Sequence, residues 1–369
     1  MGELASLPGY ESLICFGRKK DYLNKDAYRF TGFVDNCIAA AETILFDNNL
    51  HLCKKTTRKL INKIKEFDPD IIHLHNLHGY YVHVQELFEF LSEYKKPVIW
   101  TLHDCWSFTG YCPHFDMIGC EKYKSECKDC PHGFSYPFSI FKQNVNNDYF
   151  EKKRLFNSLD NLTIVTPSEW LKRKVEESFL KDNKVIVIRN GISIPEVEVK
   201  KADRFNVLAV SSYWTKEKGI DELKKIIPLL DKDFDITIVG DCKDKDPVFS
   251  RCKMVNRTNN YQELLDLYSK AHILVNPTLE EVLGLVNMEA QSCGTPVITY
   301  NTGGSPETVS DKTGIVVDKG DYKTMAKKIN ELKDNYYFNN ELIKERSVEF
   351  DKKNMLETYD RLYRDMLNS

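Results

Sequence analysis

Short apolar runs alternate with amphipathic helical patterns along the whole chain. The apolar runs predict strands at 11–17, 70–75, 97–103, 162–168 and 184–190, followed by FNVLAVSS, DITIVGD, HILVNP and PVITY. Between the later runs, DELKKIIPLL and NYQELLDLYSKA carry apolar residues at the spacing of a helix face. Strands that alternate with helices in this way are typical of an α/β protein with a parallel, doubly wound sheet.

A polar, proline-bearing segment separates the two halves of this pattern. It reads GISIPEVEVKKAD and begins at Gly191. The chain has 369 residues, which is more than one ordinary domain and fits two. We therefore expect Rossmann-like domains at 1–190 and 205–350, a linker at 191–204, and a final helical segment at 351–369.

Composition and charge exclude several classes of protein. Hydrophobic residues make up 42% and charged residues 29% of the chain, as in a soluble globular protein. The net charge of −3 gives no indication of nucleic-acid binding. No apolar run approaches the roughly 20 residues of a membrane span, and the first nine residues lack the pattern of a signal peptide.

The segment from Ile273 to Val309 holds the strongest chemical signal. It predicts a strand, an acidic loop, a helix, a glycine turn, a second strand and a Gly-Gly loop. Gly284 stands at the predicted helix start, where free backbone amides and the helix dipole suit a diphosphate. Glu289, about one turn further on, can accept both hydroxyls of a ribose. Glu281 would lie over the group that the phosphates carry, so the segment predicts a sugar-nucleotide site.

The motif NPTLEEVLGLVNMEAQSCGTPVI resembles the donor site of the retaining GT-B glycosyltransferases of the glycogen-synthase-like superfamily, glycosyltransferase family 4. HLHNLHGYY at 73–81 and TLHDCWSFTGYCPHF at 101–115 resemble the bacterial group that builds capsules and exopolysaccharides. The resemblance covers nearly the whole chain. It implies two domains that face each other across a cleft, with the last helix crossing back to the first domain. Without this context, the two glutamates would read as a solvated helix face.

The resemblance also implies the partners and the place of the reaction. A hexose-type sugar would pass from a nucleoside diphosphate sugar to a saccharide acceptor, which is expected to be lipid-linked. The protein would act in the cytoplasm, peripherally at the inner face of the membrane. No cofactor or metal is expected in catalysis, because a lysine and helix amides would take the part that Mg²⁺ plays elsewhere.

Further donor residues follow from the same resemblance. Lys218 matches the family lysine that contacts the diphosphate. The usual arginine is replaced by Ser212, and Lys216 would compensate in part, although a solvated side chain is the alternative. The remaining donor positions are Leu285, Val286, Gly303 and Gly304.

The first domain supplies the other predicted site residues. His103 and Asp104 follow a predicted strand and are expected near the donor sugar, with strand-end and turn capping as the alternative. An acceptor site is expected around Asn76, His78 and Tyr80. The nearby histidines also suggest a metal site, but His73 and His75 alternate onto one strand face within an apolar run, which favours a structural role.

An insertion at 105–132 is rich in cysteine. Cys112, Cys120, Cys127 and Cys130 have the spacing C-x7-C-x6-C-x2-C. This spacing is compatible with a structural zinc site, and free thiols or a disulfide are the alternatives. It is not the spacing of a standard zinc finger.

The N-terminus departs from the family pattern. Relatives open with a buried strand, a glycine-rich loop and a helix, whereas residues 1–7 read as the end of that helix and 11–17 as the second strand. The expectation is therefore a displaced start, a truncated chain or an altered acceptor domain. This departure keeps a second function open, a catalytically impaired GT-B module that binds a nucleotide sugar or a partner. An epimerase acting on UDP-N-acetylglucosamine is a weaker third.

Overall fold

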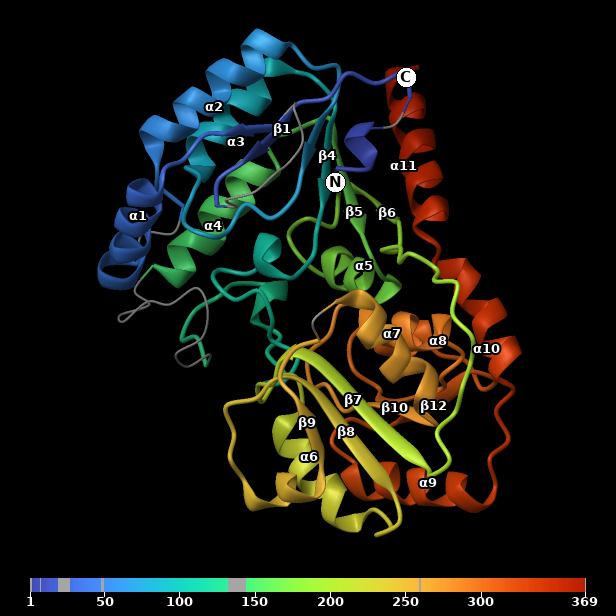
Figure 1. Ribbon diagram of the computed structural model, residues 1–369. Helices are drawn as coiled ribbons and strands as arrows, with labels where there is room; N and C mark the ends of the chain where they lie inside the picture. The colour runs from blue at the N-terminus through green and yellow to red at the C-terminus, as the bar shows by residue number, and fades with distance from the viewer. Residues whose placement is uncertain are drawn as a thin grey trace. The chain divides into compact units, whose positions relative to one another are not determined.

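The structure is a computed structural model that describes residues 2–6, 8–18, 27–47, 50–131, 144–258 and 260–368. The chain divides into two compact units (Figure 1). The N-unit comprises Met1–Ile188 and Leu356–Ser369, and the C-unit comprises Arg189–Met355. Each unit is built on a parallel sheet with helices, so the predicted α/β class is confirmed.

The main sheet of the N-unit has four parallel strands. Their order is β3 (Ile72–Leu74), β4 (Val98–Thr101), β5 (Leu162–Thr166) and β6 (Lys184–Val187). Every residue of β4 and β5 is buried, which explains why their sequences are apolar without alternation. The accompanying helices are α2 (Lys54–Phe67), α3 (Val84–Tyr94), α4 (Val145–Phe156) and α5 (Glu169–Glu176).

The start of the chain forms a separate small sheet. The strand predicted at 11–17 is shorter, β1 (Ile14–Phe16), and pairs in parallel with β2 (Ala27–Arg29). The hydrophobic pattern missed β2, because AYR includes a charged residue and forms no apolar run. The predicted helix end at 1–7 is a 3-10 turn, η1 (Leu4–Ser6), and Met1 and Leu7 lie outside the described residues. Helix α1 (Phe33–Phe46) follows β2.

The last helix, α11 (Lys352–Leu367), lies within the final helical segment expected at 351–369. From Leu356 onward it is part of the N-unit. The Tyr359 hydroxyl lies 2.8 Å from the hydroxyl of Thr101, at the end of β4. A buried polar contact therefore fixes this helix to the end of a central strand.

The C-unit has a six-stranded parallel sheet. The order is β12 (Gly314–Val317), β11 (Val297–Tyr300), β10 (Ile273–Asn276), β7 (Asn206–Tyr213), β8 (Asp235–Asp241) and β9 (Lys253–Val255). The edge strands β9 and β12 were not predicted. The helices are α6 (Ile220–Ile226), α7 (Tyr261–Lys270), α8 (Leu285–Ser292), α9 (Tyr322–Asp334) and α10 (Asn340–Ser347). Helix α6 is shorter than its sequence pattern, because Pro228 opens a 3-10 turn, η4 (Ile227–Leu229).

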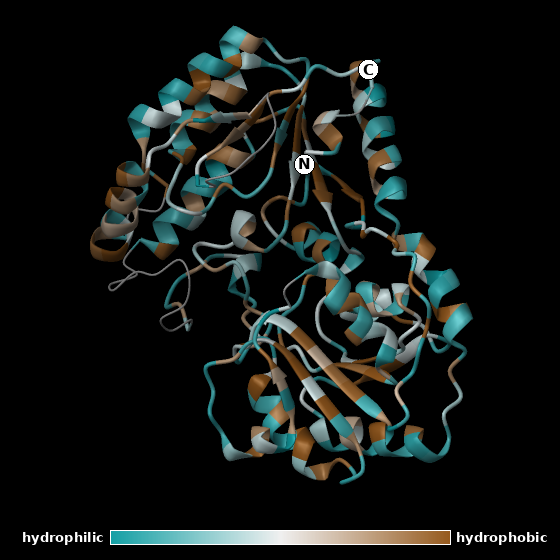
Figure 2. Cartoon of the chain, viewed as in Figure 1, coloured by the Kyte–Doolittle hydropathy of each residue, from teal (hydrophilic) through white to brown (hydrophobic). Residues whose placement is uncertain are grey.

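The order of the strands in the C-unit sheet indicates which loops would meet a ligand. β7 lies between β8 and β10 in the sheet. After β7 the chain adds β8 and β9 on one side of it and then β10, β11 and β12 on the other, so the strand order reverses at β7. Ligands of open α/β sheets bind beyond the carboxyl ends of the strands at such a point. Hydropathy colouring shows apolar residues along the strands of this sheet, as expected for a sheet covered on both faces (Figure 2).

Membrane-spanning helices were also sought. In the part of the chain that the structure describes, every helix is too short or too polar to cross a bilayer.

We predict that the amides of β1 exchange with solvent faster than those of β4. The side chains of β1 are only half-buried, whereas those of β4 are fully buried. We expect a difference of about 3 kcal/mol in opening free energy, roughly a hundredfold in rate. Hydrogen exchange followed by mass spectrometry measures both segments together. Equal protection would contradict the view that the small sheet is an independent, weaker unit.

Candidate functional site

The start of α8 is shaped by a glycine. Gly284 has a φ of +92° and directly precedes the helix. A Cβ at this position would lie 2.9 Å from Nδ2 of Asn287 and 3.2 Å from Oγ of Ser305. Positive φ and close packing both require glycine here. The amides of Leu285 and Val286, at the first two positions of α8, have no carbonyl partner within the helix and can bind an anion. The Asn287 amide already donates to the Gly284 carbonyl at 3.1 Å.

Two charged side chains meet beside this helix start. Nζ of Lys218, in the loop after β7, donates to Oε2 of Glu281 at 2.9 Å. The Lys218 side chain is 41% exposed and Glu281 is 19% exposed, so the pair is open to solvent on the lysine side. Lys216 and Ser212 are both exposed. Of the two predicted lysines, Lys218 is therefore the one that the fold joins to the Glu281 loop.

The second glycine loop packs against the first. Gly303 has a φ of +56°, and a Cβ there would collide with the backbone oxygen of Glu281. The Gly304 amide donates to the same oxygen at 3.3 Å. Only a residue without a side chain allows this approach at position 303, so backbone packing explains the first glycine of the pair. The structure thus joins both glycine loops around Glu281.

Glu289 has a partner that the sequence did not suggest. Its Oε2 accepts a hydrogen bond of 2.9 Å from the hydroxyl of Tyr268, a fully buried residue of α7. Burial raises the pKa of Glu289, and the hydrogen bond from Tyr268 acts in the opposite direction. Oε2 of Glu289 is therefore engaged by the protein, and Oε1 is the oxygen that could accept a hydrogen bond from a ribose.

A polar network behind α8 was missed by sequence reasoning. Asn276 donates to Asn287 at 2.8 Å, and Asn287 donates to Thr308 at 3.0 Å. The hydroxyls of Thr302 and Ser305 are buried and have no hydrogen-bond partner among the described residues. The one available signal was Asn287, a polar residue at a position where the helix period predicts burial. The network fixes α8 to the end of β10 and to η6 (Ser305–Thr308).

In the N-unit, the histidines form a buried hydrogen-bonded group. His75 Nδ1 lies 2.9 Å from His103 Nε2, and His73 bonds Tyr363 at 2.7 Å and Thr101 at 2.8 Å. The ring centroids of His73 and His75 are 4.3 Å apart, as alternation along one strand predicted. The partner of His103 is therefore another histidine.

The carboxylate of Asp104 pairs with His78 and not with the neighbouring His103. Its carboxylate bonds His78 at 2.7 Å and accepts from the Trp106 amide at 2.9 Å. Burial by itself raises the pKa of Asp104, but these hydrogen bonds and the His78 charge hold the pKa below its ordinary value. Asp104 is thus an ionised carboxylate that fixes the His78 ring and the turn after it.

The predicted acceptor residues are only partly brought together. A small cavity is lined by His75, Asn76, His78, His103 and Asp104. Tyr80 lies elsewhere, because its buried ring packs with Ala39 and Leu52 and its φ is +65°. The turn at Gly79 and Tyr80 directs the chain away from the cavity, which sequence spacing alone could not reveal.

Lys152 supports the loop that follows His103. Its ammonium is fully buried and donates to the carbonyls of Trp106 at 2.9 Å, Thr109 at 3.1 Å and Gly110 at 3.4 Å. It also lies 3.7 Å from the centroid of the Trp106 ring. Burial lowers the pKa of Lys152, and the buried carboxylate of Asp148 opposes that shift. The sequence signal was a lysine on the apolar face of α4.

Cys112, Cys120, Cys127 and Cys130 form no disulfide in the part of the chain that the structure describes. Burial raises the pKa of Cys112, and the neighbouring Cys130, Cys127 and Cys120 raise it further, so these thiols lie near one another. Among the described residues, however, no three His, Cys, Asp or Glu side chains are arranged to hold a metal. His132, the last residue of the insertion, lies outside the described residues. The zinc site therefore stays a prediction.

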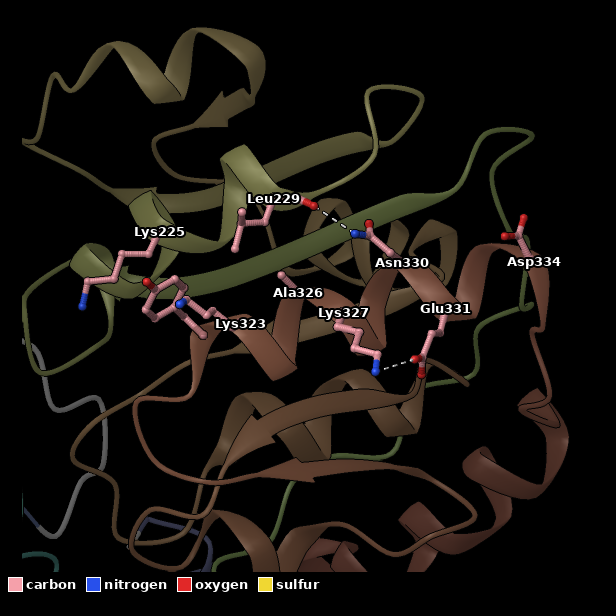
Figure 3. A pocket seen from close by; sticks show the side chains of 9 residues that line it. Lys225, Leu229, Lys323, Ala326, Lys327, Asn330, Glu331 and Asp334 are labelled. Atoms are coloured by element: carbon pink, nitrogen blue, oxygen red, sulfur yellow. Dashed lines mark hydrogen bonds and ion pairs between the residues drawn. The ribbon is translucent and has the colours of Figure 1, made fainter.

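A hollow on the C-unit surface is a different feature (Figure 3). Its side chains come from α6, η4 and α9. Asn330 donates to the Leu229 carbonyl at 2.9 Å, and Lys327 lies 3.8 Å from Glu331. Neither glycine loop lines it, and two of its charged groups, Lys327 and Glu331, pair with each other. It therefore lacks the glycine loops and the pair of Lys218 and Glu281 that mark the site at the start of α8.

We predict that acid destabilises the N-unit through its buried histidines. Burial lowers the pKa of His73 to about 3 and of His75 to about 2, from an ordinary value of 6.5. Below pH 6.5 these histidines bind protons in the unfolded chain but stay neutral in the folded chain. The free energy of unfolding therefore decreases as the pH falls. Each group contributes up to about 1.4 kcal/mol per pH unit. Urea unfolding at several pH values should show this slope.

The matched variant for that prediction is His75→Gln, which has no titrating group at this position. It should show a shallower loss of stability between neutral pH and pH 5 than the unchanged protein, even if it is less stable at neutral pH. Parallel pH dependences for the two proteins would contradict the assignment.

Both halves of the chain match models of known protein families. A model described as Glycosyltransferase Family 4 matches residues 12–195, and one described as Glycosyl transferases group 1 matches residues 204–335. The putative colanic acid biosynthesis glycosyl transferase WcaC of Escherichia coli K12 is 25% identical over 270 residues, 68% of this chain and 64% of that protein. The capsular polysaccharide biosynthesis glycosyltransferase CapM of Staphylococcus aureus is 29% identical over 208 residues, 49% and 54% of the two chains. The chain thus matches less than two thirds of the length of these curated relatives.

Solved structures show the same fold at low identity. HepE of Anabaena in complex with UDP gives a TM-score of 0.59 at 15% identity, over 84% of this chain and 82% of that one. Sucrose-phosphate synthase of Thermosynechococcus elongatus gives 0.61 at 18% identity, over 85% and 79%. Both halves of the chain therefore match glycosyltransferase models in the order that the sequence predicted, and the chain belongs to glycosyltransferase family 4, with the two Rossmann-like units of the GT-B fold.

Proposed function

We propose that this protein transfers a hexose-type sugar from a nucleoside diphosphate sugar to a saccharide acceptor, with retention of configuration, in the synthesis of a bacterial capsule or exopolysaccharide. The observation that carries the proposal is the convergence of Lys218, Glu281 and two glycine loops at the free start of α8. The relatives WcaC and CapM, named for colanic acid and capsular polysaccharide, support the product class. The UDP in the HepE structure supports a nucleotide donor.

The donor would bind along the C-unit site from phosphate to ribose. Its diphosphate accepts hydrogen bonds from the amides of Leu285 and Val286 at the start of α8. Lys218 turns from Glu281 to the phosphate, and Lys216 adds charge from solvent. The ribose hydroxyls donate to Oε1 of Glu289, because its other oxygen is engaged by Tyr268. The hydroxyls of Thr302 and Ser305, buried without described partners, are further donors for a phosphate oxygen.

The transfer step depends little on protein side chains that act as bases. The bond between the sugar C1 and the phosphate oxygen breaks, and its electron pair stays on the diphosphate. Lys218 and the helix amides stabilise that growing charge without a metal ion. The acceptor hydroxyl attacks C1 on the face that the phosphate leaves, and its proton passes to the departing phosphate oxygen. Glu281, once released by Lys218, is placed to hold a hydroxyl of the transferred sugar.

The N-unit would supply the acceptor side. Asn76, His78, His103 and Asp104 surround one small cavity with polar atoms, and these groups suit the hydroxyls of a sugar. His103 is held neutral, since burial lowers its pKa, so its ring serves as a hydrogen-bonding group. The lipid-linked character of the acceptor is proposed on the resemblance to the group that builds capsules and exopolysaccharides.

A second candidate is a module that binds the nucleotide sugar without turnover. It is favoured by Ser212, an exposed residue where relatives place an arginine. Incubation with UDP-, GDP- and ADP-sugars separates the two functions. A transferase releases nucleoside diphosphate slowly even to water, whereas a binding module raises its melting temperature and releases none.

We predict that Glu289→Ala weakens binding of the nucleotide sugar by about 2 to 3 kcal/mol, because the ribose loses a charged hydrogen-bond acceptor. A thermal-shift panel of sugar nucleotides measures the loss. Tyr268→Phe is the matched control, since it removes the hydroxyl but keeps the carboxylate. If both variants bound the donor as well as the unchanged protein, the ribose assignment would be wrong.

We predict that Lys218→Met lowers turnover by about 10- to 100-fold and affects donor affinity much less, since the phosphate charge grows in the transition state. Steady-state kinetics separate kcat from KM. Lys327→Met, which removes a lysine with 74% side-chain exposure on α9, is the control for loss of charge. A change in KM alone would make Lys218 a binding residue only.

A further inference from the structure

Two buried polar atoms of the N-unit have no hydrogen-bond partner among the residues that the structure describes. One is Nε2 of His75, which follows β3, and the other is the hydroxyl of Ser107, a buried residue of the 3-10 turn η2 (Trp106–Phe108). The two atoms do not bond each other either. Buried polar atoms without a protein partner are rare in folded proteins, and an ordered water usually supplies the missing bond.

His75 and Ser107 line the same small cavity. Its volume is about 10 Å³, and its wall also includes Asn76, His78 and His103. A volume of about 10 Å³ is close to the smallest space that holds one water. A cavity binds water when its wall is polar and offers at least two hydrogen-bond partners. This cavity meets both conditions.

His75 needs a partner at each of its ring nitrogens. Its Nδ1 lies 2.9 Å from Nε2 of His103. Burial lowers the pKa of His75 to about 2, so the ring is neutral at ordinary pH and carries a proton on one nitrogen only. In one tautomer Nε2 is a donor without an acceptor, and in the other it is an acceptor without a donor. Water meets either need, because it both donates and accepts.

We propose that the cavity binds one water molecule, which bridges Nε2 of His75 and the hydroxyl of Ser107 and thereby positions His103. The bridge extends a chain of hydrogen bonds from η2 through His75 to His103. Fixing one end of this chain fixes which nitrogen of His103 carries the proton. Ser107 and His75 are positioning residues, because they act on a sugar only through His103. The water site stands on the geometry alone, whereas its role toward a sugar rests on the proposed function.

The size of the cavity also limits what the proposed acceptor can place there. A sugar ring is far larger than about 10 Å³, so a saccharide reaches the cavity with a single hydroxyl at most. That hydroxyl would replace the water and take over its hydrogen bonds, because both have an O–H donor and two lone pairs. The ligand of this cavity is therefore one hydroxyl-bearing oxygen, and in the sugar-free protein it is water.

A high-resolution crystal structure of the full chain, grown without sugars or polyols, tests the water site. We expect one water at about 2.7 to 3.2 Å from both Nε2 of His75 and Oγ of Ser107. An empty cavity would overturn the proposal, and so would a direct hydrogen bond between the two side chains. Water is the only hydroxyl compound present, so a sugar hydroxyl cannot account for a positive result.

Nuclear magnetic resonance of protein with isotope-labelled histidine tests the positioning role. Ser107→Ala should shift the ring-nitrogen signals of both His75 and His103, because the bridge loses one end, and should leave those of His51 in place. A merely structural role for Ser107 would lower stability without moving the two signals together. Unchanged His103 signals in the folded variant would overturn the positioning role.

Ser178→Ala is the matched control. It removes another buried serine hydroxyl of the N-unit, one that donates to a backbone carbonyl at 2.7 Å. The signals of His75 and His103 should stay in place in this variant, and an equal shift would contradict the bridge. Circular dichroism checks that both variants are folded. Neither measurement needs a donor or an acceptor, so a negative result leaves the proposed transfer reaction untouched.

Discussion

The C-unit site depends on the close approach of two backbone loops. Gly303 packs against the carbonyl of Glu281, and the Gly304 amide donates to that same oxygen. This contact fixes the loop that carries Glu281 and leads into α8. The free amides of α8, the Lys218 pair and the Glu289 carboxylate are positioned from there. Since Gly303 contributes by lacking a side chain and Gly304 by its backbone amide, the site is specified by backbone packing as much as by its charged groups.

The N-unit site follows a different principle. Its polar groups lie buried or half-buried beside a central strand and pair with each other: His75 with His103, His78 with Asp104, and Lys152 with the loop carbonyls. Nε2 of His75 is the exception, since it has no partner among the described residues. Such a network is costly when broken, because each orphaned group loses its partner in a poorly solvated place. The loop after β4 is therefore held in one conformation, which suits recognition of sugar hydroxyls.

Much of this arrangement was predictable from sequence. Buried parallel strands are recognisable as apolar runs in the sequence. A glycine at a predicted helix start indicates the anion site. Tertiary partners were not predictable. Nothing in the spacing indicates that Tyr268 occupies one oxygen of Glu289, that Asp104 selects His78, or that Tyr80 turns into another cluster. Those outcomes depend on side chains that meet only after folding. Strands β2 and β9 were missed for another reason, since AYR and KMV each include a charged residue and form no apolar run.

The central claim is that a nucleoside diphosphate binds at the start of α8. Calorimetric titration of UDP, GDP and ADP into the unchanged protein and into Gly284→Ala tests it most directly. The added methyl would meet Asn287 at 2.9 Å in a backbone conformation that alanine resists. The account predicts that one of the three nucleotides binds the unchanged protein and that the variant, still folded, binds it at least about tenfold more weakly. Equal affinity of the two proteins, or no binding of any of the three nucleotides, would contradict it.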